Sequence, residues 1–274
     1  MVSRQDVDEL KNLGKTAYLL ARSDLQKFWN TLPFDRPADC RDLLVEFVPA
    51  LVNKYGKAGA VAALDWYEKV RAETPGLPVF TPVVPTESAF MNVEGIVRAE
   101  VGLLWEENAA KKAFARKRVF EALDRVVDRS VRGQVRATIT HNARRDPAKP
   151  RYARVPAGAK TCAFCTILAS RGFVYKSAET AGMTTQFHSK CDCQIVPEFK
   201  KGTARIKGYD PDALYEKFQA ARSQAYKERE QAGKARTVDN SEIAQQMRIM
   251  FPGSLSDGEG VKRSAYKPKK KQEA

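Results

Sequence analysis

Four of the five cysteines in this chain lie within one short segment, between Cys162 and Cys193. Such clustering constrains the fold strongly, because it predicts a small structural knot held together by a metal ion or by disulfide bonds. In a chain that folds in the cytoplasm, clustered cysteines indicate a metal site before they indicate disulfides. The fifth cysteine, Cys40, stands alone in an expected helix and is interpreted as a small buried or half-buried apolar side chain.

The cysteine segment (residues 162–193) has the ligand spacing of a zinc site. The sequence reads TCAFC at residues 161–165 and FHSKCDC at residues 187–193, which gives the pattern C-x2-C-x22-H-x2-C-x-C. Zinc prefers four tetrahedral ligands drawn from thiolate and imidazole. A C-x2-C turn lets two sulfurs converge on one ion, and the 22 intervening residues are long enough to form a hairpin that brings the two halves together.

Five candidate ligands compete for four places around such an ion. Cys162, Cys165 and His188 form the expected core. Cys191 and Cys193 compete for the fourth position, and the spacing slightly favours Cys191. Residues two apart on a strand face the same side, so both could point at the ion. An all-cysteine site, a set of disulfides and a set of buried thiols stay open as alternatives.

The whole chain is strongly basic. Its 274 residues carry a formal net charge of +14 with a pI near 9.6, which favours contact with polyanions or acidic protein surfaces. Hydrophobic residues make up 43% and charged residues 29%, which fits a globular protein.

No apolar run reaches the roughly 18 residues of a transmembrane helix. Residues 1–11 lack the apolar core of a signal peptide, so synthesis and folding in the cytoplasm are expected.

Residues 1–145 are predicted to form a helical domain, because apolar residues recur there at helical spacing. Pro37 in a first turn marks a helix start. Pro49 is expected to kink or interrupt the helical run, and Gly56 is expected to break it. Four prolines between residues 75 and 85 predict an extended connection, either a flexible joint or a strap across the helices. The expected helices are residues 6–29, the run from Pro37 to Gly56, residues 58–72, and residues 87–142, in which a break can fall near Asn108.

The second half of the longest expected helix is rich in arginine and lysine, with apolar residues interleaved every three or four positions. This pattern predicts an amphipathic helix whose basic face is solvated. The alternative is a basic face that meets DNA or an acidic partner. The basic residues are Lys111, Lys112, Arg116, Lys117, Arg118, Arg125, Arg129, Arg132 and Arg136.

Two further segments follow the helical domain. Residues 146–200 contain glycines and β-branched and aromatic residues around the cysteines, and they are predicted to form a small Cys/His-rich α+β unit with strands at 173–175 and 193–196. Residues 201–274 are predicted to be a charged extension with helices at 211–231 and 241–250 and a disordered, lysine-rich end at 267–271. The expected fold class is therefore α+β with a mainly helical N-terminal region.

No catalytic set is recognised in the sequence. If His188 is structural, His141 is the remaining histidine, and it has no Asp or His partner pattern nearby. It is interpreted as an exposed side chain at a helix end, favoured there by the helix dipole. A nucleophilic Cys162 would need a general base, and His188 sits among thiols that look like co-ligands. A closed four-ligand site leaves no place for a substrate, so a structural role for zinc, no enzymatic activity and no small-molecule substrate are expected.

The residues KTCAFCTILASRGFVY at 160–175 and FHSKCDC at 187–193 resemble the phage Mu F-like minor head proteins. They are most similar to the form found in phages and prophages of actinobacteria. Arg129, Arg132 and Arg136 on the preceding helix are similar in placement. The specific resemblance covers about residues 126–199, and the N-terminal helical part is similar in general character alone.

The resemblance implies a non-enzymatic protein of the virion. Such proteins lie inside the capsid in few copies, associate with the portal and with capsid or scaffold proteins, and help head assembly, DNA packaging or DNA ejection. The protein would be made in the host cytoplasm, and its basic surface would lie next to packaged DNA or an acidic portal surface. The alternative is a zinc-stabilised nucleic-acid-binding protein, whose phosphate contacts would make binding steeply dependent on salt.

Overall fold

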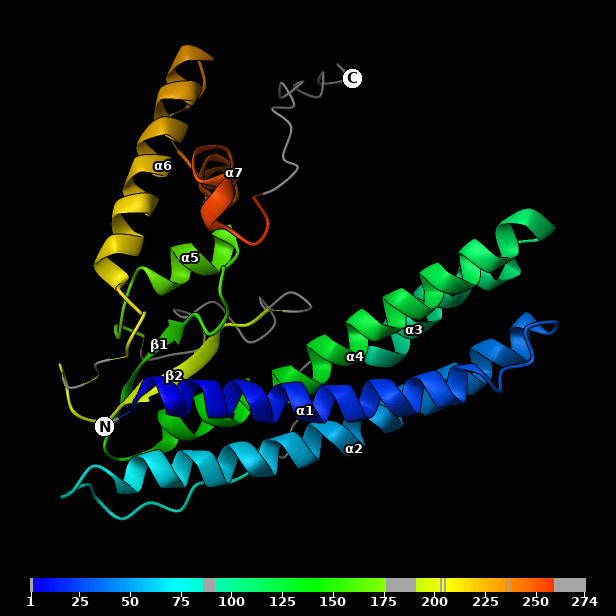
Figure 1. The fold of residues 1–274 in the computed structure, drawn as a ribbon, viewed down its shortest axis with the longest axis horizontal. Coiled ribbons are helices and arrows are strands. Elements are labelled where there is room, and N and C mark those ends of the chain that lie inside the picture. The colour runs from blue at the N-terminus through cyan, green and yellow to red at the C-terminus, as the bar shows by residue number, and fades with distance from the viewer. Residues whose placement is uncertain are drawn as a thin grey trace. The chain divides into compact units, whose positions relative to one another are not determined.

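The computed structural model describes residues 2–85, 92–175, 191–202, 204, 206–235 and 237–258, and the chain divides into two compact units. The first unit comprises residues 1–157 and 172–209, and the second comprises residues 158–171 and 210–274. Helices dominate the described residues, and their one sheet has two strands (Figure 1). These elements confirm the predicted α+β class with a mainly helical N-terminal region. The division into segments 1–145, 146–200 and 201–274 stays a prediction.

Helix α1 (Arg4–Trp29) begins at a capping box, in which two residues satisfy each other's backbone donors. The Ser3 side chain accepts the backbone N–H of Asp6, and the Asp6 carboxylate accepts the backbone N–H of Ser3 at 2.8 Å. The buried side of α1 follows the predicted spacing of three and four residues. Its members are Val7, Leu10, Gly14, Ala17, Tyr18, Ala21, Leu25 and Trp29.

Helix α2 (Pro37–Ala72) runs without interruption, so the predicted break at Gly56 is wrong. Pro37 occupies the first turn, as predicted, and Pro49 lies inside the helix without ending it. Gly56 serves close packing instead. A Cβ atom at this position would lie 2.2 Å from Gln134 Nε2, because the Gln134 side chain fills the space beside α2.

We expect Gly56→Ala to destabilise the first unit by about 1–2 kcal/mol. Overpacking costs about 1–3 kcal/mol, and the better helix propensity of alanine returns up to about 1 kcal/mol. Urea-induced unfolding followed by tryptophan fluorescence measures the change, since all 3 tryptophans lie in this unit. Gly102→Ala is the control, because a Cβ atom there meets nothing within 4 Å. If Gly56→Ala is equally destabilising in a Gln134→Ala background, the packing explanation is wrong.

Helix α3 (Val93–Glu100) and the 3-10 helix η1 (Val101–Trp105) precede helix α4 (Ala109–Arg145). The predicted break near Asn108 is confirmed, because Asn108 is the N-cap of α4 and accepts the N–H of Ala110 at 3.0 Å. Helices α1, α2 and α4 pack against one another in the first unit (Figure 1). Their core contains Ala17, Tyr18, Ala21, Leu25, Trp29, Leu32, Cys40, Leu44, Val48, Leu51, Val52, Val97, Val101, Val119, Leu123, Val127 and Val131.

The basic face of α4 is solvated over part of its length. The lysines and arginines of residues 111–118 are exposed or half-buried, as expected. Between Val126 and Ala143, however, most residues are buried, and Arg136 is only 2% exposed. The prediction of a solvated basic face is therefore wrong for the second half of α4, because α1, α2 and strand residues pack around it.

The proline-rich connection of residues 75–85 is an extended strap held against the helices. Asn142 on α4 acts as its hydrogen-bonding partner: Oδ1 accepts the N–H of Val83 and Nδ2 donates to the Val83 carbonyl, both at 2.8 Å. The Phe80 ring packs edge-on against Tyr67, with the ring centroids 6.4 Å apart. Of the two predicted alternatives, the strap is therefore the correct one.

Asp146 follows α4 and ties it to the end of α2. Arg71 donates to its carboxylate through Nε at 2.7 Å and through Nη2 at 3.2 Å. The Tyr67 hydroxyl donates to the same carboxylate at 3.1 Å, and Asp146 Oδ1 accepts the N–H of Ala148 at 2.9 Å. The carboxylate is fully buried, while the Arg71 side chain is 13% exposed. Bidentate pairs between arginine and a carboxylate are among the stronger hydrogen-bonded contacts in proteins.

Strands β1 (Arg151–Val155) and β2 (Gln194–Glu198) pair antiparallel, with Ala153 opposite Val196. The predicted strand at residues 193–196 overlaps β2 and is confirmed. The predicted strand at residues 173–175 is wrong, because Tyr175 forms only an isolated bridge with Tyr152. Sequence reasoning missed β1, since two arginines interrupt its apolar pattern; one of them, Arg154, is fully buried.

The second unit contains helices α5 (Ala163–Ala169), α6 (Pro211–Gln231) and α7 (Asn240–Met250) and the 3-10 helix η3 (Pro252–Ser254). The two helices predicted for the charged extension are confirmed as α6 and α7. Asp257 accepts the N–H of Ala163 at 2.9 Å and pairs with Arg248 at 2.8 Å, so the chain after α7 supports the start of α5. The lysine-rich end at 267–271 lies outside the described residues. The buried core of this unit contains Ala163, Ile167, Ala221, Ile243, Ala244, Met247 and Leu255.

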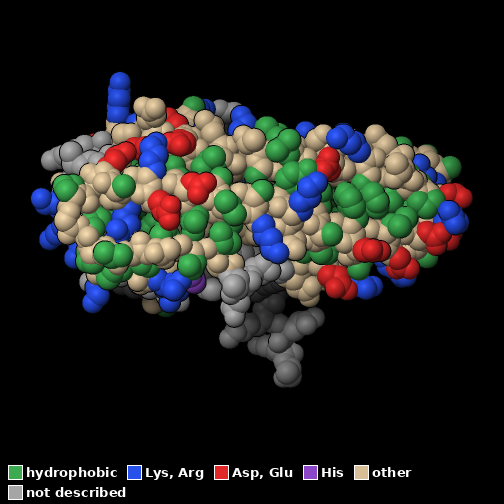
Figure 2. All heavy atoms as spheres, turned by 90° about the horizontal axis from the view of Figure 1, so that it is seen from below, with side chains coloured by type: hydrophobic (Ala, Val, Ile, Leu, Met, Phe, Trp, Pro, Cys, Tyr) green, Lys and Arg blue, Asp and Glu red, His purple; other side chains and the backbone are tan. Residues whose placement is uncertain are grey.

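Exposed apolar side chains are scattered over the helices of the first unit. Leu20 and Val61 are 53% and 51% exposed. On the face drawn in Figure 2, apolar side chains stand among lysine, arginine, aspartate and glutamate side chains. Within the described residues, no helix combines the length and the apolarity that a membrane crossing requires.

Candidate metal centre

Cys162 and Cys165 lie at the start of α5. Cys162 is the N-cap residue, and its Sγ accepts the backbone N–H of Cys165 at 3.4 Å. Both residues are buried. The C-x2-C spacing therefore folds into a single turn, and the N-cap is supplied by a thiol instead of the usual hydroxyl or carboxylate.

Cys191 and Cys193 lie directly before β2, in a segment whose backbone carbonyls accept hydrogen bonds from side chains. Arg136 donates through Nη2 to the Cys191 carbonyl at 2.6 Å and through Nε to the Cys193 carbonyl at 3.1 Å. Between them, the Asp192 carbonyl accepts from Gln194 Nε2 at 2.8 Å. Both cysteines are buried. Side-chain donors thus satisfy three consecutive carbonyls, which fixes the path of this backbone.

The structure brings two of the candidate ligands together within the first unit. The Sγ atoms of Cys191 and Cys193 lie within 4.8 Å of each other, and both residues are buried. Tetrahedral zinc with Zn–S bonds of about 2.3 Å places its sulfurs about 3.8 Å apart. The spacing of these two thiols is therefore close to what one ion requires. Cys165, Cys191 and Cys193, three buried cysteines of the ligand pattern, are together called the cysteine cluster. None of the chain's five cysteines, all of which are described, forms a disulfide.

The predicted ligands have different places in the structure. Cys191 and Cys193, the two competitors for the fourth position, lie close together in the first unit. Cys162 and Cys165 both lie at the start of α5, in the second unit. His188 lies outside the described residues.

Two buried arginines bring positive charge to the Cys191–Cys193 segment. Arg136 is 2% exposed, and Arg154, on β1, is 0% exposed. Burial lowers the pKa of the Arg136 guanidinium, the nearby Cys191 thiol raises it, and the charge of Arg154 lowers it again. Positive charge beside a thiol favours the thiolate, which is the form that binds metal ions.

Sequence reasoning placed Arg136 on a solvated face and missed its contact with the cysteine segment. One signal was present, because Arg136 is the single Lys, Arg, Asp or Glu between Gly133 and Ala143. A lone charge in such a stretch points to a buried, paired side chain. The partners themselves could not be read from the local pattern, since the two carbonyls lie 55 and 57 residues further along the chain.

His141 is half-buried on α4, so the prediction of an exposed helix-end side chain is wrong. Its Nε2 lies 3.4 Å from Arg145 Nη1. Burial lowers the pKa of the His141 imidazole, and Arg145 and Arg144 lower it further. Burial and these two arginines therefore favour the neutral ring.

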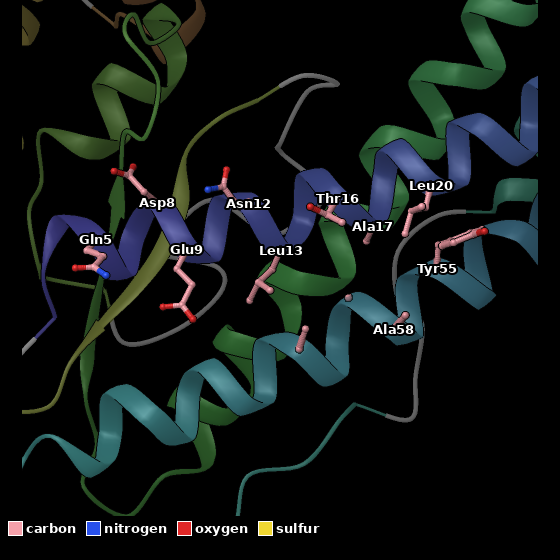
Figure 3. Close-up of a pocket in the computed structure, with 12 residues that line it drawn as sticks. Gln5, Asp8, Glu9, Asn12, Leu13, Thr16, Ala17, Leu20, Tyr55 and Ala58 are labelled. Atoms are coloured by element: carbon pink, nitrogen blue, oxygen red, sulfur yellow. The ribbon is translucent and has the colours of Figure 1, made fainter.

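A groove of about 620 Å³ lies between α1 and α2, away from the cysteines in sequence (Figure 3). Asp8 and Glu9 bring carboxylates to it, and Glu9 is paired with Lys69 at 2.6 Å. The residues that line the groove include no histidine and no cysteine, so the lining contains neither a histidine base nor a cysteine nucleophile. Its apolar lining includes Leu13, Leu20 and Ala58.

Comparison with known proteins connects the chain to phages. Residues 1–221 match the family model described as VG15 protein. The chain is 27% identical over 205 residues to the Gene 15 protein of Mycobacterium phage L5, a match that covers 57% of this chain and 64% of that protein. The chain thus spans less than two thirds of the length of this relative. No solved structure matches the chain. Because the family model covers well over half of its residues, this chain belongs to the VG15 family and is a phage protein.

Proposed function

We propose that this chain is a minor head protein of a tailed phage or prophage, located in the capsid interior. It associates with the portal and acts in head morphogenesis, DNA packaging or DNA ejection, without enzymatic activity. The VG15 match over residues 1–221 supports a phage protein and includes both the long helices and the cysteine segment. The head role itself is carried by the resemblance of residues 126–199 to the Mu F-like minor head proteins, which stays a prediction.

The charge of the chain supports a partner that is acidic or that carries phosphate groups. The formal net charge is +14, and the lysines and arginines of residues 111–118 are exposed or half-buried at the start of α4. A portal, capsid or scaffold protein with an acidic surface meets this requirement, and so does packaged DNA. Contacts to phosphate alone weaken steeply as the salt concentration rises, which separates the two kinds of partner in an experiment.

The proposed cofactor is one structural Zn²⁺ ion. Cys165, Cys191 and Cys193 supply three thiolates, and Cys162 or His188 supplies the fourth ligand. Thiolates favour zinc over cations such as Mg²⁺ and Ca²⁺, which prefer oxygen ligands. With all four positions taken by the protein, the ion stabilises the fold and offers no site for catalysis.

Co-sedimentation with procapsids tests the proposed head role. The full-length chain is mixed at physiological salt with nuclease-treated procapsids of the same phage that either contain or lack the portal. We expect the chain to sediment with the portal-containing particles and to stay in the supernatant with the portal-free ones. Tight binding to free DNA at this salt, with no portal-dependent sedimentation, would contradict the proposal and favour the nucleic-acid-binding alternative.

A further inference from the structure

We propose that Arg136 is a positioning residue of the cysteine cluster: its guanidinium fixes the Cys191–Cys193 backbone so that both thiols face one metal ion. This inference rests on the metal centre of the proposed function and adds a residue that the ligand pattern does not contain. Its basis is direct contact. Arg136 donates to the carbonyls of Cys191 and Cys193, at 2.6 Å and 3.1 Å.

The geometry of these two bonds explains why an arginine occupies this position. Nη2 reaches the first carbonyl and Nε reaches the second, so one side chain holds both ends of the Cys-x-Cys segment. A guanidinium presents its N–H groups in a rigid planar fork, whereas a lysine ammonium is a single charge on a flexible stem. A lysine at position 136 could therefore keep the charge without holding both carbonyls at once.

The Cys191–Cys193 segment is fixed by side chains along its whole length. The middle carbonyl, that of Asp192, accepts from Gln194 Nε2 at 2.8 Å, and Gln194 is itself buried. Arg136 stands in the buried half of α4, a helix of 37 residues, so the segment is anchored to the core of the first unit. Hydrogen bonds from residues that surround the metal ligands, without binding the ion themselves, orient those ligands before the ion binds. Removing such hydrogen bonds weakens metal binding.

The burial of Arg136 makes its hydrogen bonds to this segment important. A guanidinium that is 2% exposed has lost most of its contact with water, which is strongly unfavourable unless other contacts compensate. The carbonyls of Cys191 and Cys193 accept two of its N–H groups, so the buried side chain and this backbone hold each other in place.

Zinc affinity measured on the full-length protein tests this role. The reduced, metal-free chain is titrated with Zn²⁺ in competition with a chromophoric chelator, and Co²⁺ absorption reports how many thiolates bind. We expect Arg136→Met to bind zinc about 10–100-fold more weakly than the wild type. The zinc affinity of Arg136→Lys should lie between those of the wild type and Arg136→Met. Arg125→Met is the matched control, because it removes an exposed arginine from the same helix and should leave the affinity unchanged.

The outcomes separate this inference from the metal centre itself. If the wild type binds neither Zn²⁺ nor Co²⁺, the metal centre is wrong and the role of Arg136 is wrong with it. If the wild type binds zinc and Arg136→Met binds it equally well, the metal centre stands and the positioning role is overturned. Circular dichroism and tryptophan fluorescence check that the variants fold. If Arg136→Met does not fold, the zinc affinity of Arg136→Lys decides the question. A wild-type zinc affinity in Arg136→Lys overturns the proposal, because lysine keeps the positive charge but lacks the planar guanidinium that reaches both carbonyls.

Discussion

Chelation of zinc from the full-length chain is expected to unfold the cysteine segment, which is the largest effect that the proposed metal centre implies. Structural zinc contributes roughly 10–16 kcal/mol in small zinc-finger peptides. The net stability of a whole domain is typically about 5–15 kcal/mol. Scanning calorimetry in reducing buffer should show a transition that the chelator removes.

Two cysteine variants control the chelation experiment. Cys165→Ser removes one thiol of the cysteine cluster, so it should reproduce the effect of the chelator in untreated protein. Cys40→Ser should leave the profile unchanged, because Cys40 Sγ donates to the Pro33 carbonyl at 3.1 Å, and a serine hydroxyl can make the same bond. Identical profiles of the reduced wild type with and without chelator would show that no metal stabilises this segment.

Asp146→Ala is expected to destabilise the first unit by about 3–5 kcal/mol, because it breaks a buried ion pair and leaves the other charge behind. The lost carboxylate accepts two bonds from Arg71 and one from Tyr67. Tyr67 is fully buried, so its hydroxyl would also lose a partner that water cannot easily replace. Urea-induced unfolding followed by tryptophan fluorescence gives the free-energy difference.

An exposed ion pair provides the matched control for Asp146. Glu94 pairs with Arg98 at 3.0 Å on α3, with both side chains more than half exposed. Glu94→Ala should therefore cost no more than about 1 kcal/mol. Asp146→Asn keeps the shape of the side chain and part of its capacity to accept hydrogen bonds, without the charge. Its free energy of unfolding should therefore lie between those of the wild type and Asp146→Ala. Equal, small effects of Asp146→Ala and Glu94→Ala would mean that the Asp146 contacts do not join α2 to α4 as described.

The helices could be predicted from the sequence because their signals are local. Apolar spacing marks the buried side of α1, Pro37 marks the start of α2, and Asn108 marks the start of α4. The wrong break at Gly56 shows where local signals fail. Glycine is read as a helix breaker, but here it makes room for Gln134, which lies on another helix.

The cysteine pattern predicted which residues carry the chemistry and left their arrangement open. The spacing could not decide between Cys191 and Cys193, and the structure places their two thiols within 4.8 Å of each other, in a segment that distant donors hold. The partners of Arg136 were beyond local prediction for the same reason, because they become its neighbours only when α4 and the sheet pack together.

Metal analysis of the purified full-length protein shows whether the cysteine cluster is a structural metal centre. The chain is expressed with zinc supplied, purified under reducing conditions, and its metal-to-protein ratio is measured by elemental analysis. We expect one zinc ion per chain, retained in Cys40→Ser and lost when Cys165, Cys191 and Cys193 are all replaced by serine. Wild-type protein without bound metal, or a triple variant that keeps its zinc, would contradict it.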